Sequence, residues 1–147
     1  SYNGKGVVII ILDTGVDMGT PGLKTLPDGG VKVIDAQDFS GEGDVSLEKA
    51  AKGVEGKEKY LKNPDGLRLY GYDRLKYTAK DSLYYIGVLK EERFMNSSIP
   101  DVNNNGKKND QFGVIVFNTA DGWLAYVDLD GDGNLSDEQP LWNYKKK

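Results

Sequence analysis

The sequence has 147 residues, enough for one domain or for a small core that carries one large insertion. It contains no cysteine and no histidine, which excludes disulfides, thiolate metal sites and a complete Ser-His-Asp or Cys-His catalytic site within this chain. Its 19 basic and 23 acidic residues give a formal charge of −4, so general affinity for nucleic acid is not expected, and no apolar run reaches the roughly 20 residues of a membrane span.

The first predicted element is a strand over residues 7–12, an unbroken run of Val, Ile and Leu. Because no polar residue alternates with the apolar ones, we expect this strand to be buried on both faces, as in a parallel sheet covered by helices. A loop rich in Gly and Pro follows over residues 15–22. In open α/β sheets, reactive groups gather at such carboxyl ends of strands. The chain begins with Ser1 and lacks a signal-peptide pattern, so we expect a processed or trimmed piece of a longer protein.

The remaining elements indicate a β-rich unit. Ser46 as an N-cap and Gly53 as a stop predict a short helix over residues 46–52, and residues 53–66 read as a loop. A hairpin loop is expected over residues 118–122. Strands are predicted over residues 31–35, 67–70, 83–89, 113–117 and 123–127.

One strand buried on both faces, followed by half-buried strands, does not make one complete sheet. The fold class predicted is therefore α+β and β-rich, with a strand from the core of a larger fold and an inserted, mostly antiparallel β subdomain. The predicted boundary separates residues 1–26 from residues 27–147.

The segment over residues 4–23 resembles the aspartate motif of the subtilisin-like serine protease family, in which a buried strand ends in Asp-Ser/Thr-Gly-Ile/Val-Asp. The resemblance implies that Asp13 is the catalytic carboxylate, which holds an imidazole in the correct tautomer and stabilises its cation. Thr14 and Gly15 would shape the turn, and Asp17 would support it. The alternative is that Asp13 only caps a turn, a common use of Asp at strand ends.

The resemblance also implies what this chain lacks. Relatives carry their histidine in a His-Gly-Thr-His-like segment and their nucleophile in Gly-Thr-Ser-Met, and neither segment occurs here. The partners implied are the remainder of a parent protease chain and the peptide or protein substrate of that parent. The parent reaction would be serine attack on a peptide carbonyl followed by hydrolysis of the acyl-enzyme. We expect this chain alone to be inactive.

Two departures from ordinary subtilisins indicate a branch of the family. Most relatives carry His where this chain has Thr20, and many carry an acid that serves a calcium site where this chain has Gly22, which puts that calcium site in doubt. Both departures resemble the tripeptidyl-peptidase II and pyrolysin branch. That branch has a long insertion between its aspartate and histidine segments, and residues 27–147 are similar to it.

The segment over residues 128–139 resembles the start of an EF-hand-type calcium loop. Acids at its positions 1, 3 and 5 would converge on one hard cation, Gly133 at position 6 makes the sharp turn, and position 7 offers a carbonyl. Position 12, normally a bidentate Glu, is Gln139. The candidate calcium ligands are Asp128, Asp130, Asp132, Asn134, Asp137 and Glu138. The alternative is a solvated acidic turn.

A second, weaker candidate lies at residues 101–110, where amides replace acids at the odd positions and two lysines follow. Fewer carboxylates mean weaker calcium binding, and an Asn-rich turn is the alternative. The candidate ligands are Asp101, Asn103, Asn105 and Asp110. Structural Ca²⁺ is the cofactor predicted at both loops. A rival function from another class is a stand-alone calcium-binding interaction module without catalysis.

Overall fold

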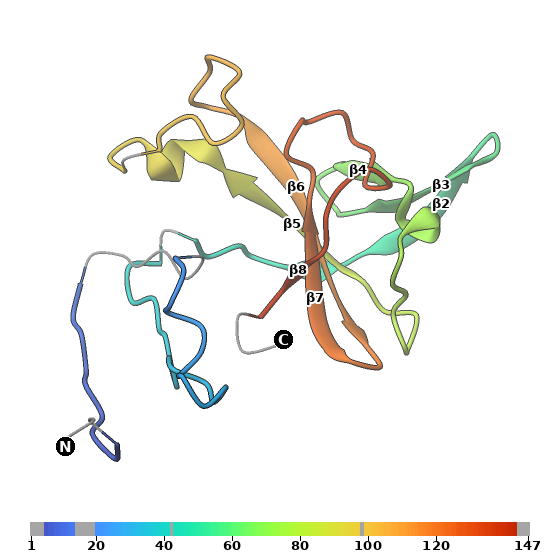
Figure 1. Ribbon diagram of the computed structural model, residues 1–147. Helices are drawn as coiled ribbons and strands as arrows, with labels where there is room; N and C mark the ends of the chain where they lie inside the picture. Colours follow the sequence, from blue (N-terminus) through green and yellow to red (C-terminus); the bar gives the residue numbers. More distant parts are fainter. Residues whose placement is uncertain (1–4, 14–19, 42, 98, 144–147) are drawn as a thin grey trace. The chain divides into compact units, whose positions relative to one another are not determined.

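The computed structural model describes residues 5–13, 20–41, 43–97 and 99–143. The chain divides into two compact units, Ser1–Asp38 and Phe39–Lys147 (Figure 1). This division reflects contacts within the chain, whereas the boundary predicted after residue 26 separates a segment of a larger fold from an insertion. That boundary therefore stays a prediction. No helix in the described part of the chain is long and apolar enough to cross a membrane.

The second unit is built on a five-stranded antiparallel sheet in the order β1-β5-β6-β7-β8 (Figure 1). Its strands are β1 (Glu48–Lys49), β5 (Tyr85–Lys90), β6 (Gln111–Thr119), β7 (Gly122–Val127) and β8 (Leu141–Trp142). Strands β6 and β7 form a hairpin in which Thr119 pairs with Gly122. The predicted strands over residues 83–89, 113–117 and 123–127 and the hairpin between the last two are confirmed.

A three-stranded antiparallel sheet contains β2 (Ala51–Glu55), β3 (Glu58–Lys62) and β4 (Arg68–Tyr70). The strand predicted over residues 67–70 is confirmed, but the helix over residues 46–52 and the loop over residues 53–66 are wrong. Residues 51–55 form a strand because they pair with β3. In this pairing Gly53 lies under the ring of Tyr60, where an added Cβ would come within 2.3 Å of the ring. A glycine that admits a cross-strand aromatic ring favours the strand over the helix.

The core lies between the two sheets and consists mainly of Leu, Ile and aromatic side chains. Ile86, Ile115 and Tyr126 pair across β5, β6 and β7, and all three are buried. Two short 3-10 helices, η1 (Tyr72–Arg74) and η2 (Glu91–Phe94), follow β4 and β5. The other core members are Leu61, Leu69, Tyr72, Leu75, Tyr84, Phe117, Leu124 and Leu135. The described structure is therefore β-rich and antiparallel, as predicted.

The first unit has a different character. Residues 7–12 lie in no strand, and their side chains are 68–92% exposed. The expected burial on both faces is absent in this chain, because no strand in the described residues pairs with this segment. Residues 31–35 were also predicted as a strand, but only an isolated bridge joins Val31 to Thr25. That bridge closes a tight turn in which Gly29, at φ 83°, donates to the Leu26 carbonyl.

Candidate functional site

The loop over residues 128–139 begins where β7 ends, and its first residue is held at the edge of the core. Asp128 is only 4% exposed, and its backbone N–H donates to the Gly113 carbonyl at 2.8 Å. The Asp128 carboxylate accepts from the backbone N–H groups of Gly131 and Gly133, at 3.1 Å each. A buried carboxylate therefore folds the loop around itself.

The same loop brings three carboxylates together. Ligand oxygens of Asp128, Asp130 and Asp132 all lie within 4.8 Å of one another. The side chains at loop positions 3 and 5 also cap the backbone two residues later, since Asp130 accepts from the N–H of Asp132 and Asp132 from the N–H of Asn134. This geometry matches the predicted convergence at positions 1, 3 and 5. Among the described residues, no other group of acids converges in this way.

The electrostatics of this cluster are unfavourable without a cation. Burial, together with the neighbouring Asp132 and Asp130 carboxylates, raises the pKa of Asp128 to about 6, and the hydrogen bond from the Gly133 N–H opposes this shift. The pKa of Glu138 is raised as well, mainly by burial and then by Asp130 and Asp137, against the N–H of Leu129. A divalent cation at this point would favour the ionised form of each group.

The loop is anchored to β4 of the second sheet. The backbone N–H of Tyr70 donates to the Gly133 carbonyl at 2.7 Å, and the Tyr70 carbonyl accepts from the N–H of Leu135 at 3.0 Å. Leu135, at position 8 of the loop, is completely buried in the core. Gly71, at φ 74°, makes the close approach possible, because an added Cβ would lie 2.4 Å from the Asn134 Oδ1. The loop's conformation is therefore coupled to core packing.

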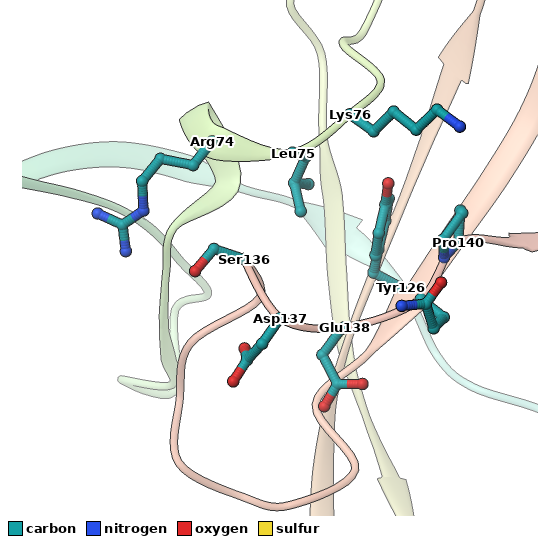
Figure 2. A pocket seen from close by; sticks show the side chains of 9 residues that line it. Arg74, Leu75, Lys76, Tyr126, Ser136, Asp137, Glu138 and Pro140 are labelled. Carbon is teal, nitrogen blue, oxygen red and sulfur yellow. The ribbon is translucent and has the colours of Figure 1, made fainter.

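The two other acidic candidate ligands of this loop, Asp137 and Glu138, lie outside the three-carboxylate group. Glu138 accepts from the N–H of Leu129 at 2.7 Å. Asp137 and Glu138 line a hollow, and Figure 2 shows their carboxylates pointing away from the buried Tyr126 hydroxyl. That hydroxyl has no hydrogen-bond partner in the described structure. Sequence reasoning did not single out Tyr126.

The second candidate loop repeats the turn but not the charge. Asp101 accepts from the N–H groups of Asn105 and Gly106, at 3.1 and 2.9 Å, just as Asp128 does in the first loop. The amide groups of Asn103 and Asn105 both donate to the carboxylate of Asp110. Amide donors thus satisfy Asp110 within the protein, so the structure gathers no carboxylate cluster here.

Sequence reasoning also missed a buried carboxylate that frames this second loop. Glu91, fully buried, accepts from the N–H of Val102 at 2.7 Å and from the N–H of Asp110 at 3.0 Å. The acid lies 10 residues before the loop and follows a strand, so no motif marks it. A further bond joins the two loops, from the Asn103 amide to the Leu129 carbonyl at 2.9 Å.

The predicted catalytic aspartate lies in the first unit. Asp13 is exposed and directly follows the exposed apolar run. Thr14, Gly15 and Asp17 lie outside the described residues. The roles of the four residues of this motif therefore stay predictions.

Comparison with known proteins points to one group of peptidases. The chain is 33% identical over 97% of its length to pyrolysin from Pyrococcus furiosus. It is also 45% identical over 51 residues to tripeptidyl-peptidase 2 from Oryza sativa and 53% identical over 49 residues to that of Drosophila melanogaster. These shorter matches cover 35% and 33% of this chain.

The chain spans 11% of the length of pyrolysin and 4% and 3% of the two tripeptidyl-peptidases. No family model matches the sequence. No solved structure matches it either.

Proposed function

Because the chain belongs to the subtilisin-like family, in its pyrolysin and tripeptidyl-peptidase II branch, we propose that it is a segment of a serine peptidase and supplies that enzyme's catalytic aspartate. The observation that carries this proposal is the similarity to pyrolysin over 97% of the chain. The Asp13 motif adds the chemical reason, since its residues match the family pattern.

In this proposal Asp13 accepts a hydrogen bond from the imidazole of a histidine elsewhere in the parent. That bond fixes the tautomer of the imidazole and stabilises the cation formed when it takes the proton of the catalytic serine. Thr14, Gly15 and Asp17 shape and support the turn that presents Asp13. The chain contains no histidine, so it does not hydrolyse peptides alone.

The exposure of residues 7–12 supports the placement of this segment in a larger sheet. Six apolar side chains at 68–92% exposure are unfavourable in water, and burying each is worth about 1.5–3 kcal/mol. A strand from the core of a parallel sheet has this composition, because neighbours cover both of its faces. The proposal is that the parent supplies those neighbours.

The proposal is tested by replacing Asp13 with Asn in the full-length parent. An amide presents the wrong hydrogen-bonding partner to the imidazole, so kcat should fall by about 10⁴-fold while the enzyme stays folded. Asp65→Asn, at an exposed position in the turn between β3 and β4, is the matched control and should retain most of the activity. A near-normal rate for the Asp13 variant would remove this residue from the catalytic site.

We also propose that the loop over residues 128–139 binds a structural Ca²⁺. Ca²⁺ takes six to eight oxygen ligands, and the loop offers the clustered carboxylates of Asp128, Asp130 and Asp132. The raised pKa of Asp128, at about 6, is the second observation in support, because a crowded and buried carboxylate gains most from a bound cation. The Asn134 carbonyl and a carboxylate of Asp137 or Glu138 would complete the shell.

The second loop would bind Ca²⁺ more weakly. Asp101 and Asp110 are its carboxylates, and the Asn103 and Asn105 amides already serve Asp110 as donors. The oxygens of these two amides accept from the N–H groups of Asn105 and Lys107, so neutral amide oxygens stand where the loop over residues 128–139 has carboxylates. The role proposed for both loops is stability of the parent, by preferential binding to the folded state.

A further inference from the structure

The outer face of the five-stranded sheet carries apolar side chains at positions where an antiparallel sheet normally places polar ones. Cross-strand pairing defines one row of this face, in which Tyr85 pairs with Val116, Val116 with Ala125, and Ala125 with Leu141. The neighbouring residues in the strands, Ile86, Ile115 and Tyr126 among them, point to the core. Apart from Lys49, which pairs with Tyr85, and Asn118, which pairs with Trp123, the described side chains of this outer face are therefore apolar too.

This row and the adjacent Trp123 form what we call the open face: Tyr85, Val116, Trp123, Ala125 and Leu141. Trp123 is 55% exposed and Leu141 is 52% exposed. The centroids of the Tyr85 and Trp123 rings lie 6.1 Å apart, so both aromatic groups are on the same side of the sheet. Tyr and Trp are the residues most enriched among those that dominate binding energy at protein interfaces.

Among the described residues of the second unit, a segment of the chain covers the other end of this face. A Cβ added at Gly87 would meet the Ser46 carbonyl at 2.4 Å and the Val45 side chain at 2.8 Å, so the segment before β1 crosses the sheet there. Phe112 and Val114, on the same face, are buried. The open face continues this apolar surface, and the described segment before β1 does not extend over it.

We propose that the open face docks against an apolar surface of the parent polypeptide outside residues 1–147. About nine-tenths of the length of the pyrolysin relative lies beyond the segment matched here, so a large covalently linked partner is at hand in a protein of that kind. This proposal rests on the chain being part of such a parent, but not on the role of Asp13 or on calcium.

The size of the open face favours a tethered partner over a second copy of the chain. Five side chains, two of them about half exposed, offer on the order of 300 Å². A stable complex between separate proteins buries about 800 Å² on each partner. A linked partner needs far less, because the tether raises its effective concentration to the millimolar range.

The test is site-specific photocrosslinking in the full-length parent, with p-benzoylphenylalanine replacing Trp123. Irradiation should join this position to a segment of the same polypeptide outside residues 1–147, as identified by mass spectrometry. Val54 on β2, 66% exposed, is the matched control, and the same label there should not reach that segment. A crosslink only to residues 1–38, a crosslink to a second copy, or none at all overturns the proposal.

A charge at the same place gives an independent readout. Trp123→Glu should lower the melting temperature of the parent by at least about 2 °C, because a carboxylate would be buried at the contact. Val54→Glu should leave it unchanged, and equal effects of the two substitutions would contradict docking at the open face. Peptidase activity is measured separately: a parent that crosslinks as expected but never cleaves peptides defeats the proposed function and leaves this contact standing.

Discussion

The loops over residues 101–110 and 128–139 share their turn geometry and differ in how they handle charge. In both, the first aspartate accepts from two backbone N–H groups farther along the loop. In the loop over residues 128–139, three carboxylates then converge. In the loop over residues 101–110, the amides of Asn103 and Asn105 instead donate to Asp110.

The anchors differ too. Leu135, at position 8 of one loop, is buried in the core, and Lys108, at position 8 of the other, is exposed. The difference teaches that a turn motif sets the path of the backbone, while the side chains at its odd positions decide whether a cation is needed.

The largest effect that would sharpen this comparison is expected at position 8. Leu135→Ala removes a fully buried side chain and should lower the free energy of unfolding of the chain by about 2–5 kcal/mol. Lys108→Ala is the matched change in the other loop and should alter it by less than about 0.5 kcal/mol. Urea denaturation followed by tryptophan fluorescence measures both. Similar losses for the two variants would mean that both loops are anchored alike.

Calcium binding at the loop over residues 128–139 is expected to stabilise the folded chain by a comparable free energy, and the loop over residues 101–110 should contribute little. At 100 times its dissociation constant, a ligand that binds only the folded chain stabilises it by about 2.7 kcal/mol, so calcium should raise the melting temperature and a chelator should lower it. Asp128→Asn should abolish most of this response, and Asp101→Asn should leave most of it. The response should also shrink as pH falls through about 6, because protonation of Asp128 competes with the metal.

No shift at millimolar calcium would defeat the metal proposal for both loops. A response that survives Asp128→Asn but is lost in Asp101→Asn would reverse the order of the two sites.

A smaller effect is expected at Glu91, the buried anchor of the loop over residues 101–110. Glu91→Gln places an amide N–H₂ where a carboxylate oxygen now accepts from the Val102 or Asp110 N–H. One buried bond is lost, and the free energy of unfolding should fall by about 1–3 kcal/mol. Hydrogen exchange at Val102 and Asp110 should accelerate, whereas exchange at Gly131 and Gly133 should not. Unchanged exchange at Val102 and Asp110 would show that Glu91 does not hold this loop.

The smallest effect is expected from adding a charge at a position where the two loops differ. Asn105→Asp removes an amide that donates to Asp110 and supplies a further carboxylate beside Asp101. Metal-free stability should fall by about 1 kcal/mol, and the calcium-induced rise in melting temperature should exceed that of the unaltered chain by a few degrees. Asn104→Asp, at an even-numbered position, is the control and should do neither. A calcium response unchanged by Asn105→Asp would mean that charge is not what distinguishes the loops.

The sequence by itself determined the features that depend on neighbours along the chain. The strand-like composition of residues 113–117 and 123–127, with the turn between them, predicts the β6–β7 hairpin. The spacing of Asp128, Asp130 and Asp132 predicts their convergence, because both patterns act over a few residues. The motif around Asp13 likewise indicates the peptidase family to which the comparisons assign the chain.

Tertiary structure decided what depends on distant partners. Residues 46–52 have good helix propensity, yet β1 pairs with β5, and the Tyr60 ring covers Gly53. The burial of Glu91 and the anchoring of Gly133 and Leu135 to Tyr70 join residues far apart in the chain. The exposure of residues 7–12 follows the same rule, since an apolar strand is buried only where other strands are present to pair with it.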